Sequence, residues 1–113
     1  MTNDRTQPER PRRTRKRVLL AGFITYSNGL HTLNCSVKDI SEDGARIVAS
    51  GALPFPDQIY LVVINRRSAH QAVVVWRRGQ QAGLKFVRSF LVTELPEPSL
   101  AYLRRTWADR ALR

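Results

Sequence analysis

The chain has 113 residues and a formal net charge of +10, with 42% hydrophobic and 25% charged side chains. This length suits one domain with a modest core and is too short for two independent ones. The single cysteine, Cys35, excludes an internal disulfide. No apolar stretch approaches the roughly 20 residues of a membrane-spanning helix, so we expect a cytoplasmic protein.

The N-terminal segment is strongly basic. Residues 1–17 carry seven basic and two acidic side chains, which is half of the net charge. Residues 1–12 include Pro8 and Pro11 and almost no apolar side chains, so we expect them to form a flexible arm when nothing is bound. So basic an arm predicts an anionic partner.

Short apolar runs separated by turn residues fill the chain from Val18 to Phe86, a pattern typical of a small antiparallel barrel. Hairpins between these apolar runs are favoured at 27–29, 42–44 and 78–79, where a glycine follows Asn, Asp or Arg. The expected strands are 19–26, 32–41, 45–49, 58–65, 70–77 and 81–86. The predicted fold class is therefore all-β, with a six-stranded antiparallel barrel over residues 13–90 and one terminal helix.

Residues 91–113 are predicted to form a linker and a C-terminal helix that begins with Ser99 as N-cap. The predicted fourth strand is apolar on both faces, so its outer face needs a cover. Helical spacing gives the tail an apolar stripe that can provide this cover, made of Leu100, Leu103, Trp107 and Ala111. The arginines expected to face away from it are Arg104, Arg105 and Arg110.

In the second predicted strand, strict alternation of side chains would place apolar residues on the outer face. Cys35 and Val37 share the parity of Asp39 and would point outward with it in a regular strand. We therefore predict a β-bulge near Lys38 that turns Val37 back into the core.

Two histidines and one tryptophan are expected to have structural roles rather than to bind a ligand. His31 and His70 are predicted to be surface residues at strand ends, and they lack the Cys or carboxylate neighbours of a metal site. Trp76 follows an apolar strand and is expected in the core or at its rim rather than as a base-stacking platform. The three acidic residues near Gly44 sit in one exposed turn, which does not provide the distinct environments of a catalytic acid and base. We predict no enzymatic activity.

Two short motifs carry the functional hypothesis. Arg13 and Arg17 form an RxxxR pair, and Asp39, Ser41 and Gly44 form DxSxxG. Guanidinium groups stack on purines and donate two parallel hydrogen bonds to guanine or phosphate. An arginine run can equally be a solvated arm that binds acidic polymers, and DxSxxG can be an ordinary turn. In an extended segment, however, Asp39 and Ser41 leave the same face.

In this order and spacing, the two motifs resemble those of the PilZ family. Family-like segments also follow at 44–47, 73–76 and 83–86, so that the resemblance covers roughly residues 10–90. It implies a small barrel that binds cyclic di-GMP. The residues it implies as ligand contacts are Arg12, Arg13 and Arg17 from the arm, Asp39, Ser41 and Gly44 from the barrel, and Arg46 at the border.

The resulting hypothesis is a receptor whose arm orders over cyclic di-GMP and signals to a downstream protein, in motility, polysaccharide secretion or surface attachment. Cyclic di-GMP is its ligand, and no cofactor is expected. Two alternatives stay open: a barrel that binds single-stranded nucleic acid nonspecifically, and a protein-interaction adaptor that uses the Leu100 and Trp107 face. Because Arg12 adjoins Arg13, the ligand could be one molecule or a stacked pair.

Overall fold

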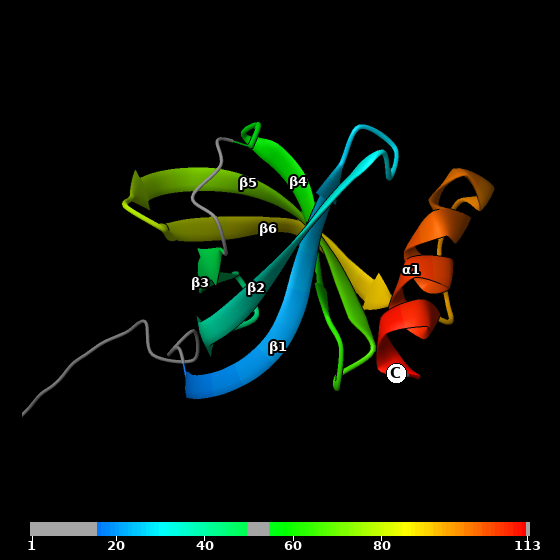
Figure 1. Ribbon diagram of the computed structural model, residues 1–113, viewed down its shortest axis with the longest axis horizontal. Helices are drawn as coiled ribbons and strands as arrows, with labels where there is room; N and C mark the ends of the chain where they lie inside the picture. Colours follow the sequence, from blue (N-terminus) through cyan, green and yellow to red (C-terminus); the bar gives the residue numbers. More distant parts are fainter. Residues whose placement is uncertain (1–15, 50–54, 113) are drawn as a thin grey trace, which may run out of the picture.

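Residues 16–49 and 55–112 are described by the computed structural model. Six antiparallel strands close into a small barrel-like ring in the order β1-β2-β3-β6-β5-β4, which confirms the predicted fold class (Figure 1). The strands are β1 (Lys16–Tyr26), β2 (His31–Ile40), β3 (Gly44–Ala49), β4 (Gln58–Val63), β5 (Ser68–Arg78) and β6 (Gln81–Leu91). Two pairings between strands distant in sequence, β3 with β6 and β1 with β4, complete the ring.

Two strands end at positions that differ clearly from prediction. β6 continues to Leu91, five residues past its predicted end at Phe86. Gln71 pairs with Arg88 and Ala72 with Phe86, so Val87 is an unpaired bulge residue that interrupts the two-residue period. β4 ends at Val63, two residues before the predicted end. The chain then turns through a hairpin in which the Arg67 amide donates to the Ile64 carbonyl at 3.1 Å.

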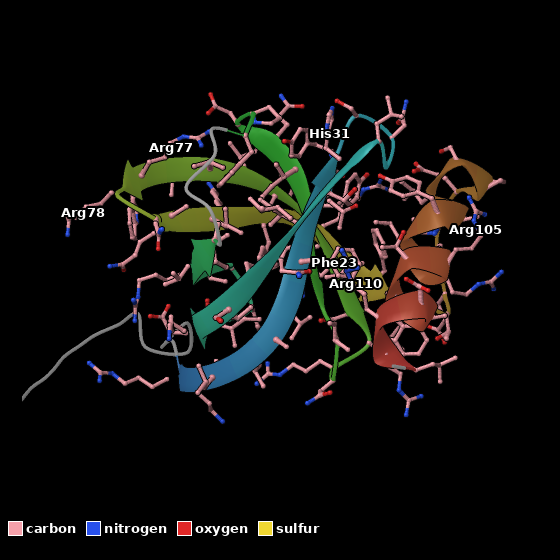
Figure 2. The ribbon with its side chains drawn as sticks, viewed as in Figure 1. Phe23, His31, Arg77, Arg78, Arg105 and Arg110 are labelled. Atoms are coloured by element: carbon pink, nitrogen blue, oxygen red, sulfur yellow. The ribbon has the colours of Figure 1, made fainter. Side chains whose placement is uncertain are left out.

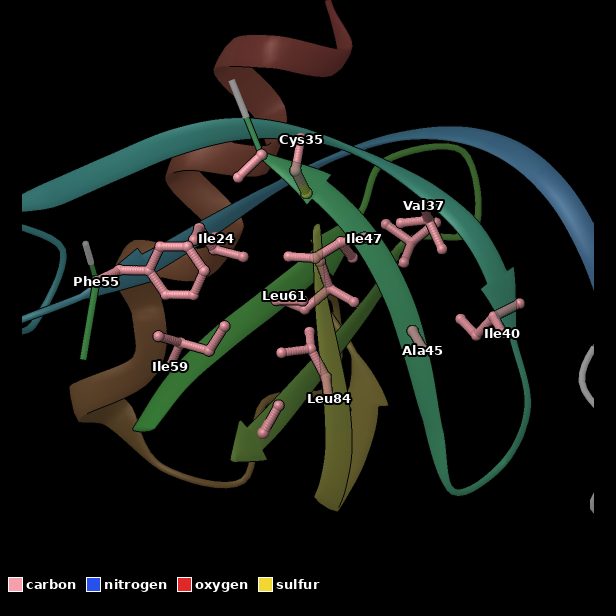
Figure 3. Packing of buried hydrophobic residues seen from close by; sticks show 14 residues of the cluster. Ile24, Cys35, Val37, Ile40, Ala45, Ile47, Phe55, Ile59, Leu61 and Leu84 are labelled. Atoms are coloured by element: carbon pink, nitrogen blue, oxygen red, sulfur yellow. The ribbon is translucent and has the colours of Figure 1, made fainter. Parts of the chain in front are cut away.

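The main core lies inside the ring and is built from inward-facing residues of all six strands (Figure 3). Val37 is fully buried, and the register between β2 and β3 shifts between Val37 and Asp39. The bulge predicted at Lys38 is therefore confirmed. Burial raises the pKa of the Cys35 thiol to about 12, so Cys35 is a small apolar core residue with little thiolate character.

A second apolar cluster forms outside the ring, between the barrel and the tail. Figure 1 shows the C-terminal helix lying outside the ring of strands. The tail consists of a 3-10 turn, η3 (Pro98–Leu100), and the helix α1 (Ala101–Ala111). Leu100 and Leu103 pack against Phe23 and Val62, which is the cover predicted for the outer face of β4. The apolar face of the tail is thus used within the chain, which disfavours the adaptor alternative.

Three details of the tail prediction were wrong. Ser99 lies within η3, and α1 follows Leu100 without a side-chain cap, because Pro98 starts a tighter turn first. Ala111 is exposed at the end of the helix. Arg110 does not face away from the barrel: its guanidinium lies 5.0 Å from the centre of the Phe23 ring, whereas Arg105 points away (Figure 2).

Trp107 ties α1 to the barrel, because its indole Nε1 donates to the Ile64 carbonyl at 2.9 Å. Replacing Trp107 by phenylalanine keeps an aromatic ring and removes the donor. We expect a loss of about 1 kcal/mol in the free energy of unfolding, measured by urea denaturation. An unchanged midpoint and slope would show that this bond does not stabilise the docked helix.

No helix within the described residues is long and apolar enough to cross a membrane.

Candidate functional site

Residues of both motifs meet in a row across the outer face of the barrel. Arg17 on β1 is the register partner of Asp39 on β2, and Asp39 is in turn the partner of Arg46 on β3. The row continues to Gly83 on β6, which pairs with Trp76 on β5. The inward neighbours Ile40, Ala45 and Leu84 are buried, which fixes the row on the outside. The registers of β1 with β2 and of β2 with β3 thus place Arg17, Asp39 and Arg46 side by side.

The centre of this row is a charged pair held from a third strand. Arg46 Nε donates to Asp39 Oδ2 at 2.8 Å, and Arg46 Nη1 donates to the Gln81 side-chain oxygen at 3.0 Å. The Asp39 side chain is 14% exposed and that of Arg46 32% exposed, so the pair is partly shielded from water. Because a planar guanidinium bonded at two points has little freedom, it holds the carboxylate in a defined orientation.

The turn after Asp39 is closed by its own hydrogen bonds. The Ser41 hydroxyl accepts the Asp43 amide at 3.1 Å, and the Ser41 amide donates to the Gly44 carbonyl at 2.8 Å. The Asp43 carbonyl accepts the Phe86 amide at 2.7 Å, which anchors the turn to β6. A hydroxyl that accepts one hydrogen bond can still donate its own hydrogen. Ser41 is therefore a positioned donor beside the row.

Gly44 has a different role from the one expected. We expected glycine to reverse the chain, but Gly44 is the first residue of β3 and pairs with Lys85. A Cβ atom at this position would lie 2.1 Å from the Leu84 carbonyl oxygen. Glycine is needed here because two backbones approach closely, not because the chain turns. The contribution of Gly44 is thus to let β3 and β6 pair under the motif.

Trp76 and Gln81 are the outer-face residues that the sequence analysis did not include in the site. A Cβ atom on Gly83 would lie 2.0 Å from Trp76 Nε1, so the Trp76 indole covers Gly83 at the end of the row. The Arg78 guanidinium lies 5.7 Å from the centre of that indole. In the sequence, Gly83 could have indicated this contact, because a glycine inside a strand often marks the close approach of a large group.

Three predicted arginines remain to be placed. Arg17 is exposed and stands at the β1 end of the row. Arg12 and Arg13 lie outside the described residues, as does the rest of the predicted arm before Lys16.

His70 is buried, contrary to the prediction of a surface residue, because β5 begins at Ser68 and carries it inside the barrel mouth. Its ring stacks on Phe86 at 4.1 Å between centres. Its nitrogens lie 2.7 Å from the Ser89 hydroxyl and 2.9 Å from the Ser68 hydroxyl. Burial, with a smaller contribution from the charge of Arg66, lowers the pKa of His70 from 6.5 to about 4. His70 is therefore neutral at pH 7.

This depressed pKa predicts acid sensitivity. Between pH 6.5 and about 4 the unfolded chain binds a proton at His70 that the folded chain does not, so stability falls as the pH is lowered through that window. The loss should reach about 3 kcal/mol at most. Denaturation curves at pH 7, 5.5 and 4 should show a shallower pH slope for His70→Gln than for wild type. Equal slopes would mean that His70 does not carry the effect.

Within residues 16–49 and 55–112, no group of three or more His, Cys, Asp or Glu side chains is placed to hold a metal ion.

Comparison with known proteins agrees with this fold. The sequence pattern of the PilZ domain matches residues 11–99. Among solved structures, the PilZ domain of CeSA from a cellulose-synthesizing bacterium superposes with a TM-score of 0.51 at 10% identity, covering 86% of this chain and 98% of that one. An uncharacterized Legionella protein gives a TM-score of 0.47 at 16% identity, covering 86% and 97%. No curated protein sequence matches the chain. The match over most of the chain shows that this protein belongs to the PilZ domain family.

Proposed function

We propose that this PilZ domain is a receptor for cyclic di-GMP. The observation that carries the proposal is the row in which Arg17, Asp39 and Arg46 are register partners on the outer face, beside the Ser41 turn. PilZ domains are generally receptor domains for this nucleotide rather than enzymes, and the row provides groups suited to both guanine and phosphate.

In the proposed complex, the Asp39 carboxylate accepts from the N1–H and N2–H donors of a guanine, while Arg46 keeps that carboxylate oriented. Ser41 donates to a phosphate or ribose oxygen. Arg17, with Arg12 and Arg13 from the arm, stacks on the purine or pairs with phosphate. Trp76 bounds the site at the far end of the row.

Binding is opposed by the ordering of the arm and favoured by the charge of the ligand, which carries at least two negative charges. Because the arm closes over the nucleotide, its position differs between the bound and free protein, and a downstream protein can respond to that difference. We place this receptor in the cytoplasm, with an output in motility, polysaccharide secretion or surface attachment.

Calorimetric titration with cyclic di-GMP, and separately with a single-stranded oligonucleotide of matched charge, tests the proposal. We expect saturable binding of the cyclic dinucleotide with a modest salt dependence. Preferential binding of the oligonucleotide, with a steep salt slope and little base preference, would replace the receptor by the nucleic-acid alternative.

A further inference from the structure

The barrel is not closed along its whole height. β1 pairs with β2 from Lys16 to Tyr26, with a register shift between Arg17 and Leu20, but with β4 only from Gly22 to Thr25. One further backbone bond, from the Ile64 amide to the Ala21 carbonyl, is the last link between β1 and the β4–β5 hairpin among the described residues. Figure 1 shows the first part of β1 curving away from that hairpin. No described residue pairs with the outer edge of residues 16–20, and an open edge can accept another strand.

A positively charged cleft of about 550 Å³ lies at this edge. Lys16 from β1 and Arg66 from the β4–β5 hairpin line it, and these two elements border the gap. Ser41 and Ser68 add hydroxyl groups, and Glu42 is the acidic residue in the lining. Two cations against one carboxylate, with the Ser41 hydroxyl beside them, form a site for an anionic group.

The edge also carries an exposed apolar side chain. Leu19 is 74% exposed and lies in the register shift between Arg17 and Leu20. A strand added along β1 would cover part of it. The unpaired edge and the basic cleft therefore adjoin each other, and Leu19 lies on the same part of β1.

We propose that an acidic, extended segment of a partner protein adds as a strand to residues 16–20 of β1 and places a carboxylate between Lys16 and Arg66. The charge of the added strand distinguishes the possible partners of this edge. The chain's own N-terminal residues are rich in arginine, and a second copy would bring its own Lys16 and Arg17 to the same short ladder. An acidic partner removes this repulsion.

The site adjoins the nucleotide row, because Arg17 lies on the same strand and Ser41 lines the cleft. The partner would therefore meet the strand that carries Arg17. In this respect the inference deepens the proposed receptor function by naming the chemistry of its downstream partner. Binding of the acidic strand itself does not depend on cyclic di-GMP.

A fluorescein-labelled hexapeptide of alternating glutamate and valine provides the probe, with the lysine–valine peptide as its counterpart. Fluorescence anisotropy should show binding of the acidic peptide alone. Lys16→Glu combined with Arg66→Glu should weaken its affinity by about tenfold or more. Arg104→Glu combined with Arg105→Glu on α1 makes the same change in net charge and should leave the affinity within about twofold. Equal losses in the two double variants would reduce the interaction to general attraction and overturn the proposal.

Hydrogen exchange on wild type tests strand addition without any variant. Peptide binding should slow exchange of amides between Val18 and Ala21. Binding without such protection, or a stable dimer through this edge in the absence of peptide, would contradict the proposal. Calorimetry with cyclic di-GMP on the same samples separates the two claims. Peptide binding without nucleotide binding would refute only the receptor, and nucleotide binding without peptide binding would refute only the docking site.

Discussion

Replacement of Asp39 by asparagine is expected to weaken cyclic di-GMP binding by about 10- to 100-fold. The carboxylate is the acceptor we assign to guanine, and it is held by Arg46 at 2.8 Å. Asparagine has nearly the same shape but offers only one acceptor oxygen and no charge. The loss of one hydrogen bond to a charged group amounts to about 1.5–3 kcal/mol, which gives the expected range. Isothermal titration calorimetry measures it directly.

Asp57→Asn is the matched control for this experiment. Asp57 forms a comparable pair with Arg77 at 2.9 Å, but its side chain is 77% exposed and it does not belong to the row. Its replacement should leave nucleotide affinity within about twofold, since exposed ion pairs contribute little. If Asp39→Asn bound the nucleotide as tightly as wild type, Asp39 would not be the guanine acceptor.

Replacement of Gly44 by alanine should destabilise the fold by about 3 kcal/mol, the upper end for overpacking. The added Cβ would lie 2.1 Å from the Leu84 carbonyl oxygen. That atom belongs to the backbone of a paired strand, so relief requires β3 and β6 to separate. Chemical denaturation should show a lower midpoint.

Gly79→Ala separates close approach from backbone conformation. Gly79 has a φ of 61° and no atom within 4 Å of the added Cβ, so alanine there should cost only about 1 kcal/mol for the left-handed conformation. If the two alanine variants were equally stable, close packing under Gly44 would not be the reason for the glycine in the motif.

Much of the fold could be predicted because the inside and outside of a barrel alternate along each strand. The parity conflict between Val37 and Asp39 was enough to predict the bulge at Lys38, which the register shift between β2 and β3 confirms. For β6, the predicted end at Phe86 was wrong. In a regular strand Arg88 would share the inward face of Leu84 and Phe86, and the bulge at Val87 shifts this alternation so that the strand continues to Leu91.

Side-chain identity was a weaker guide where a polar group is buried. His70 is inside the barrel mouth because two serines satisfy its ring nitrogens, and a sequence does not show which serines will be near. Arg110 covers Phe23 with its guanidinium, whereas a helical hydrophobicity pattern assigns every arginine to the solvent face.

Part of the site could be predicted because it depends only on local structure. Asp39 and Ser41 are close in sequence, so their common position follows from the strand and turn alone. Arg46 was expected only at the border of the site, and its pairing with Asp39 depends on the register of β2 and β3. Gln81 and Trp76 join through β6 and β5, whose registers short motifs do not specify. The predicted contacts of Arg12, Arg13 and Arg17 with the nucleotide stay predictions.

Backbone amide NMR spectra recorded during titration with cyclic di-GMP test the central claim most directly. The account predicts saturable shifts at Arg17, Asp39, Ser41 and Arg46, which lie on the outer-face row and its turn, with little change along α1. An absence of shifts at saturating nucleotide, or shifts confined to α1, would contradict it.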